Sequence, residues 1–275
     1  MQHIYYKKNI PIEFEGMLDA SVLLPAEESG FFVFDCYQDD AHAALSFLEK
    51  WNERNWLKRK LPVAARVVVF SEYTANHIRK YYPKLMKNLV VLHPKVDETF
   101  HPIDDDAKDI VRYNLTNGES YFLYRGPIHP AAALTDLLKG FSIFKKKMGS
   151  NMKLVLCGPV SKKGRPFLDA IETYKYREDL VIRQHVTDES ELIAAAYALI
   201  HPCRWERFGF PVLKAMKSGV AVLTADNSSM SEFTSMAGMY FNENDPADIG
   251  EKLIRIYKDE QMRQDMIGTG LSKSL

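Results

Sequence analysis

The segment 201–219, HPCRWERFGFPVLKAMKSG, combines residue types that suit the binding of an anion or a sugar. An apolar stretch at 197–200 precedes it, Glu206 lies in the following loop, Gly209 allows a turn, and Pro211 opens a helix. Proline suits the first helical turn because its missing N–H would have had no intrahelical partner. A carboxylate accepts hydrogen bonds from hydroxyl groups, and the free amides of a helix start favour a phosphate. The segment therefore predicts a binding site at a strand-to-helix junction.

Short apolar strands alternate with amphipathic helices from residue 121 onward, which is the pattern of repeated βαβ units. We expect strands over 121–125, 152–157, 180–184, 198–202, 220–224 and 238–241, and helices over 246–258 and 259–268. Ligands of such parallel sheets bind beyond the carboxyl ends of the strands, where the strand order reverses. The residues that follow these strands should therefore share one rim of the sheet: Gly126, Gly158, Val186, Glu206, 227–229 and a helix start near Glu232.

The residues around Glu206 resemble the donor-site motif of the GT-B glycosyltransferases of family 4, in which two glutamates eight positions apart surround the pattern GFGLPVLEAM. Further segments match that family in the same order, at 65–71, 88–104, 121–144, 152–159, 180–202 and 220–249. The resemblance implies an α/β, GT-B-like fold. It would have a Rossmann-like C-terminal domain with a parallel sheet and an incomplete N-terminal α/β domain.

The resemblance also implies a function, namely transfer of a sugar from a nucleoside-diphosphate-sugar donor to a glycan, lipid-linked or protein acceptor. By the same resemblance the reaction retains anomeric configuration and needs no cofactor or bound metal. Glu206 would be the catalytic residue, orienting the donor sugar. The implied donor-binding residues are Arg125, Gly126, Gly158, Val186, Phe208, Gly209, Phe210, Pro211, Lys214 and Glu232. Glu232 has a second interpretation, as an acid that complements a helix dipole.

Three departures from the family pattern bear on activity. Lys214 stands where the second glutamate is expected, and a lysine can donate a hydrogen bond to a ribose hydroxyl or a phosphate but cannot accept one. Ala131 and Ala132 replace an Arg-Lys pair at a phosphate-facing turn, either because the helix start packs there or because the site has lost its charges. Phe34 replaces a histidine. Lys214 and Arg125 are the cations left to compensate.

These departures leave a second function open, that of a catalytically silent binding protein or one half of a two-chain enzyme. The resemblance implies a longer chain, so 1–100 is expected to form only part of an N-terminal, acceptor-side domain. Residues 101–120 would link it to the nucleotide-sugar-binding domain at 121–275. An incomplete sheet exposes an unpaired edge, which calls for a partner chain or self-association.

The composition is that of a globular α/β protein. The chain has 46% hydrophobic and 26% charged residues. Its 36 basic residues balance its 36 acidic ones, so it has no net positive charge that would attract nucleic acid. The basic runs 58–60 and 145–147 are expected to be solvated, with docking to anionic lipid as the alternative.

The three cysteines, Cys36, Cys157 and Cys203, are expected to be reduced thiols in or near the core. With no long apolar run, we expect a cytoplasmic protein of glycan biosynthesis, with peripheral membrane contact as the alternative.

Overall fold

The computed structural model describes residues 4–7, 29–32, 55, 66–84, 89–93, 95–204, 209–227 and 229–273. The described residues up to Asp97 belong to one compact unit and those from Glu98 onward to another. Residues 101–120, which the sequence predicts as a linker, contain helix α3 (Asp105–Thr116) and belong to the second unit. The sequence does not predict this helix, whereas the linker and the division into an acceptor-side and a donor-side domain stay predictions.

The first unit contains a four-stranded sheet in the order β1-β2-β3-β4. Its strands are Ile4–Lys7, Ser29–Phe32, Arg66–Val69 and Leu89–Val91, of which the last three are parallel. Helix α2 (Glu72–Tyr81) follows β3 and is capped by Ser71, whose hydroxyl accepts the Thr74 N–H at 3.1 Å. Such an N-cap satisfies an amide that has no partner within the helix.

The second unit is built on a six-stranded parallel sheet in the order β10-β9-β8-β5-β6-β7. Each predicted strand is confirmed, with ends shifted by no more than one residue: β5 Tyr121–Arg125, β6 Lys153–Cys157, β7 Leu180–Arg183, β8 Ala198–His201, β9 Ala221–Ala225 and β10 Gly238–Phe241. The prediction succeeds because strands buried on both faces form short apolar runs. The strand order reverses between β5 and β8.

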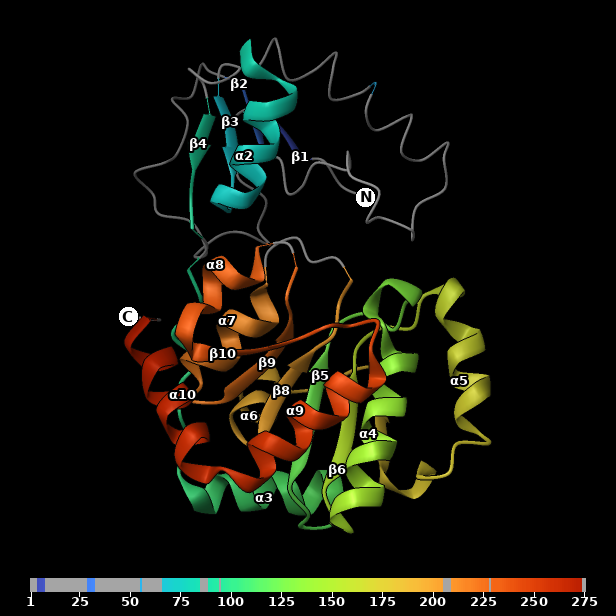
Figure 1. Cartoon of the computed structure of the whole chain (residues 1–275). Coiled ribbons are helices and arrows are strands. Elements are labelled where there is room, and N and C mark those ends of the chain that lie inside the picture. Colours follow the sequence, from blue (N-terminus) through green and yellow to red (C-terminus); the bar gives the residue numbers. More distant parts are fainter. Residues whose placement is uncertain are drawn as a thin grey trace. The chain divides into compact units, whose positions relative to one another are not determined.

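Helices connect these strands (Figure 1). The longer ones are α4 (Leu134–Met148), α9 (Pro246–Lys258) and α10 (Glu260–Lys273), of which α10 continues past its predicted end. The shorter ones are α5 (Arg165–Ile171), α6 (Glu189–Ala194), α7 (Phe210–Lys217) and α8 (Met230–Thr234), with the 3-10 turns η5 (Pro130–Ala132), η6 (Lys162–Gly164), η7 (Arg177–Asp179) and η8 (Ser235–Ala237). Among the described residues, no helix is long and apolar enough to cross a membrane.

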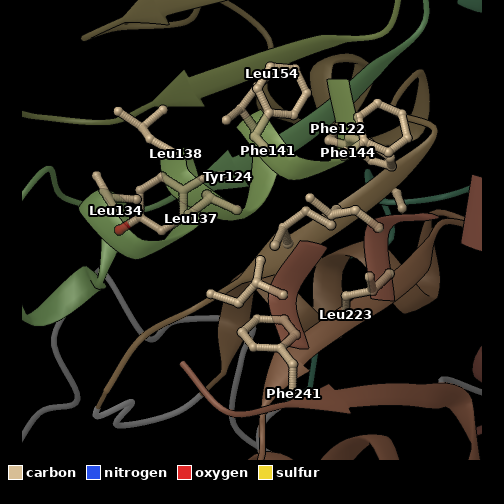
Figure 2. Close-up of a cluster of buried hydrophobic side chains, with 14 of the residues drawn as sticks. Phe122, Tyr124, Leu134, Leu137, Leu138, Phe141, Phe144, Leu154, Leu223 and Phe241 are labelled. Carbon is tan, nitrogen blue, oxygen red and sulfur yellow. The ribbon is translucent and has the colours of Figure 1, made fainter. Parts of the chain in front are cut away.

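Helix α4 supplies much of the core on one face of the sheet. Figure 2 shows Leu134, Leu137, Leu138, Phe141 and Phe144 from this helix facing side chains of the sheet. The spacing of three and four residues puts all five on one side of the helix. Helices α4 and α9 pack so closely that a Cβ added at Gly140 would lie 2.6 Å from the Ile249 side chain. Glycine is therefore needed at this crossing.

The basic run 145–147 differs from its prediction at one residue. Lys145 is 8% exposed rather than solvated, and its ammonium lies 2.9 Å from Asp179 and 3.3 Å from the carbonyl of Met152. Lys153 binds the other oxygen of Asp179 at 2.8 Å. Burial opposes ionisation of Asp179, but the hydrogen bonds from both lysines prevail and hold its pKa below the ordinary value. Lys146 and Lys147 are exposed, as predicted.

Helix α10 is held by an ion pair that should make stability depend on pH. Arg263 binds both oxygens of Glu260, at 2.8 and 2.6 Å, and lies over the Tyr197 ring at 4.4 Å. These hydrogen bonds lower the pKa of Glu260 from 4.5 to about 2. Because the pKa is depressed in the folded state, the stabilisation is present above pH 4.5 and is lost as the pH falls toward 2.

We expect Glu260→Gln to lower the free energy of unfolding by about 1 kcal/mol at pH 7, a modest value because Glu260 is largely exposed. The difference from the parent chain should shrink below about pH 4 and vanish only below pH 2, where Glu260 becomes protonated in the folded state as well. Urea unfolding at several pH values measures it. A difference that stays constant over this pH range would show that the Glu260 charge is not what stabilises α10.

Candidate functional site

The carboxyl ends of β5, β6 and β8 meet at the reversal of strand order, the position where sheets of this kind bind ligands. Arg125 ends β5, Gly126 and Gly158 follow β5 and β6, and α7 begins after Gly209. All of them belong to the second unit. The predicted residues Glu206 and Phe208 lie outside the described residues, so their roles stay predictions.

Three charged residues form one cluster at this edge, which we call the charge cluster: Arg125, Glu189 and Lys214. The Arg125 Nε donates to one oxygen of Glu189 at 2.9 Å, and the Lys214 ammonium donates to the other at 2.8 Å. Their side chains are 23%, 26% and 16% exposed, so water screens the three charges only in part. The cluster carries a net positive charge of one.

Helix α6 places Glu189 in this cluster. The Asp188 carboxylate caps the helix by accepting the Glu191 N–H at 3.0 Å, which makes Glu189 the first helical residue. Hydrogen bonds from Ser190 and from the backbone hold the pKa of Asp188 below its ordinary value, so the cap is charged at neutral pH. Glu189 is not among the site residues predicted from the sequence, because an acid in a first helical turn also has a purely local explanation.

Lys214 contacts two residues of the second unit, Glu189 and Phe100. Besides Glu189, its ammonium lies over the Phe100 ring at 4.6 Å from the ring centre, a cation–π geometry. In the sequence, Lys214 stands where the family motif has a glutamate. In the structure, the Lys214 ammonium forms an ion pair with the carboxylate of Glu189. The acid that the motif lacks at 214 is present nearby on α6, as Glu189.

The two glycine turns of the site pack directly on each other. Gly126 donates its N–H to the Cys157 carbonyl at 3.0 Å, and Gly158 donates to the Arg183 carbonyl at 2.8 Å. A Cβ added at Gly158 would lie 1.9 Å from the Gly126 carbonyl oxygen. Glycine at 158 is therefore required by the close approach of these turns, whatever ligand the turns admit. The predicted contact of Gly126 with a diphosphate is not tested by this packing.

The alanines at 131–133 lie in the turn after β5, and packing explains the alanine at 132. Ala132 is 3% exposed and belongs to the hydrophobic core, and Ala133 adopts the left-handed conformation with φ 49°. The Arg204 N–H donates to the Ala131 carbonyl at 2.9 Å, which ties this turn to the end of β8. Of the two explanations offered from the sequence, helix-start packing accounts for Ala132. A lysine at 132 would begin its side chain inside the core.

The remaining predicted residues take the positions that the strand pattern indicates. Gly209 has φ 63°, and a Cβ added there would lie 2.6 Å from the Met230 methyl group. Phe210 and Pro211 form the first turn of α7, Val186 lies between β7 and α6, and Glu232 lies in the first turn of α8. The described contacts join Arg125 and Lys214 through Glu189, and they do not extend to Val186.

Two of the three cysteines lie among the described residues. Cys157 and Cys203 are free and buried, as the sequence predicts, and burial raises the pKa of the Cys157 thiol. A protonated thiol is a poor nucleophile, so Cys157 is a packing residue of β6. Cys36 lies outside the described residues. In the described part of the chain, no group of three or more His, Cys, Asp or Glu side chains could hold a metal ion.

The architecture is that of a GT-B glycosyltransferase. The chain aligns with the crystal structure of WaaG, a glycosyltransferase involved in lipopolysaccharide biosynthesis, with a TM-score of 0.75 and 18% identity, covering 91% of this chain and 71% of that one. It aligns with Anabaena HepE in complex with UDP and glucose with a TM-score of 0.76 and 12% identity, covering 89% of this chain and 66% of that one.

The family model described as Glycosyl transferases group 1 matches residues 105–272, more than half of the chain. The chain therefore belongs to this family. It is 25% identical over 246 residues to the O-antigen chain mannosyltransferase B of Escherichia coli, covering 88% of this chain and 63% of the relative. It is also 25% identical over 170 residues to the alpha-1,3/1,6-mannosyltransferase ALG2 of Saccharomyces cerevisiae, covering 62% of this chain and 31% of that relative. The chain thus spans less than two thirds of either relative.

Proposed function

We propose that this chain transfers a sugar, and specifically mannose, from a nucleoside-diphosphate donor to a glycan or lipid-linked acceptor. The observation that carries the proposal is the family match over 105–272, which includes the whole rim of strand ends and the charge cluster. The similarity to an O-antigen chain mannosyltransferase and to a serotype-specific mannosyltransferase, both of Escherichia coli, supports mannose as the sugar. UDP bound to the structural neighbour HepE supports a nucleotide at the corresponding fold position.

The finer assignments belong to the same proposal. The chain would be a family 4 enzyme that retains anomeric configuration without a bound metal or cofactor. Glu206 would orient the donor sugar, and the first amides of α7 would face its phosphate. Arg125 and Lys214, held by Glu189, would supply positive charge near the diphosphate leaving group, where preorganised charge lowers the barrier most. A cytoplasmic location, with Lys146 and Lys147 near an anionic membrane face, completes this proposal.

A silent or partner-completed protein is the second candidate, and the charge cluster is the observation that favours it. Glu189 already neutralises one of the two cations at the rim, and the position of the family's lysine is occupied by buried Ala132. A cation paired with a phosphate contributes about 1.5–3 kcal/mol as a charge-assisted hydrogen bond. A site with one net positive charge would hold a diphosphate correspondingly weakly.

Calorimetric titration separates the two candidates. We expect one of GDP, UDP and ADP to bind saturably, with a Kd of about 0.1–1 mM, given the loss of one phosphate contact. The mannose conjugate of that nucleotide should bind at least as tightly. Glu206→Gln should weaken the conjugate more than the nucleotide alone, because the proposed contact is with the sugar. Absence of binding by every nucleotide to a folded sample would refute the transferase proposal for this chain alone.

A further inference from the structure

A cavity lined by residues other than those of the charge cluster lies between the start of α4 and the start of α5. Its volume is about 340 Å³, within the lower range of small-molecule sites. We call it the α4–α5 cavity. Its lining includes His129, Leu134, Thr135, Lys163, Phe167 and Arg204. None of Arg125, Glu189 and Lys214 lines it.

The charged groups at this cavity are cationic. Within the described part of the chain, Lys163 is exposed and makes no hydrogen bond or ion pair. Arg204 is compensated, since it binds Asp136 at 2.6 Å and the Pro130 carbonyl at 2.9 Å. Among the described residues that line the cavity, none is Asp or Glu. The ammonium of Lys163 therefore gives the cavity a positive charge that the described part of the protein does not neutralise.

His129 lines the same cavity, and one nitrogen of its ring is left to donate a hydrogen bond. Its Nδ1 accepts the Ala131 N–H at 3.1 Å, so the neutral ring carries its proton on Nε2. Burial, and then the nearby charge of Lys163, lower the pKa of His129, so the ring is neutral at pH 7. His129 and Lys163 line the same cavity. One ligand group could therefore meet both, an N–H from the imidazole and a charge from the ammonium.

The rest of the lining is mostly apolar. Leu134 and Phe167 belong to or pack against the hydrophobic core, so they offer fixed apolar surface beside the two polar groups. Thr135 adds a hydroxyl at the first turn of α4. A ligand that fits needs one compact anionic end and one apolar or ring-shaped body. A phosphomonoester has this chemistry. Its phosphate oxygens are negatively charged and accept hydrogen bonds, and its organic part can be the apolar or ring-shaped body.

We propose that the α4–α5 cavity binds a phosphomonoester, with its phosphate between Lys163 and His129 and its organic body against Leu134 and Phe167. None of the residues predicted to bind the donor lines this cavity, and the proposal does not rest on the proposed transferase activity. The same chemistry could belong to a soluble phosphorylated compound or to the phosphate headgroup of a lipid. A soluble probe and vesicles, compared on the same variants, distinguish these two sources.

Phenyl phosphate is the probe that tests the proposal, in a titration followed by amide chemical shifts of the full chain. We expect saturable shifts at 129–135 and 163–170, with inorganic phosphate and phenol each binding at least about fivefold more weakly. Lys163→Gln should weaken phenyl phosphate about tenfold, the effect of losing one charge-assisted hydrogen bond. Lys162→Gln is the matched control, because the neighbouring Lys162 is exposed and does not line the cavity.

A second variant keeps the test independent of packing. Ala170 is exposed on α5 and lines the cavity, so Ala170→Glu adds a negative charge without removing a core contact and should abolish binding. Glu189→Gln should leave the affinity unchanged. If Glu189→Gln changes the affinity and Lys163→Gln does not, the phosphate binds the charge cluster and the proposal is wrong. Equal effects of Lys162→Gln and Lys163→Gln would likewise overturn it.

Vesicles identify the source of the phosphate. Phosphatidylcholine vesicles with and without phosphatidic acid are compared for binding to the parent chain and to Lys163→Gln. Saturation by phenyl phosphate without Lys163-dependent vesicle binding supports a soluble ligand. Lys163-dependent binding to the phosphatidic acid vesicles supports a lipid headgroup. No Lys163-dependent binding to either probe overturns the proposal.

Discussion

Gly158→Ala is expected to lower the free energy of unfolding of the second unit by about 3–5 kcal/mol, because the added methyl group has no space to occupy. The new Cβ would lie 1.9 Å from the Gly126 carbonyl oxygen, whereas real Cβ atoms essentially never come within 3.0 Å of such an atom. The neighbour is backbone and cannot rotate away. The turns after β5 and β6 would have to separate, breaking the bond from the Gly126 N–H to the Cys157 carbonyl. Urea unfolding followed by circular dichroism measures the loss.

Gly118→Ala is the matched control for Gly158→Ala. Gly118 also has a positive φ, 88°, but a Cβ added there meets nothing within 4 Å. This control should therefore cost only the backbone strain, about 1–2 kcal/mol. If the two substitutions destabilise the chain equally, the close approach of the two turns does not determine the requirement for glycine at 158. Nucleotide binding is a second readout, because separation of these turns would also displace Arg125.

The sheet of the second unit was predictable from the sequence because its determinants are local. Buried parallel strands are short apolar runs separated by helical patterns, so each strand end was found to within one residue. Helix α9 was also predicted with its observed bounds, since Asp245 caps it and Pro246 opens it. Helix α3 was missed because its acidic first turn and its turn-like end, Asn117 and Gly118, suggested a linker.

The charge cluster was not predictable, because its members are far apart in the sequence. Arg125 and Glu189 are 64 residues apart and Glu189 and Lys214 are 25 apart, so no spacing rule connects them. The family motif identifies position 214 in the sequence. Only the placement of α6 in the fold shows that Lys214 contacts Glu189. Lys145 was assigned to a solvated run for the same reason. Its partner Asp179 lies on a turn far along the chain, and nothing near Lys145 in the sequence indicates it.

Lys214→Glu should destabilise the second unit and should not by itself restore a donor site, although it recreates the family's two-glutamate motif. The Lys214 ammonium lies 2.8 Å from a Glu189 oxygen, so a carboxylate at 214 would face a carboxylate instead of a cation. The substitution also removes the contact over the Phe100 ring. We expect a loss of about 2 kcal/mol in the free energy of unfolding at pH 7, below the range for fully buried pairs because both residues are partly exposed.

Three comparisons isolate the like-charge contact in Lys214→Glu. Lys214→Met removes the ion pair without adding a negative charge and should cost about half as much. Glu189→Gln combined with Lys214→Glu should recover most of the loss, because the amide of Gln can donate a hydrogen bond to the new carboxylate. Two facing carboxylates raise each other's pKa, so the Lys214→Glu chain should gain stability relative to the parent as the pH falls from about 7 to about 5. If the double variant is no more stable than Lys214→Glu alone, Glu189 is not the partner that made lysine necessary at 214.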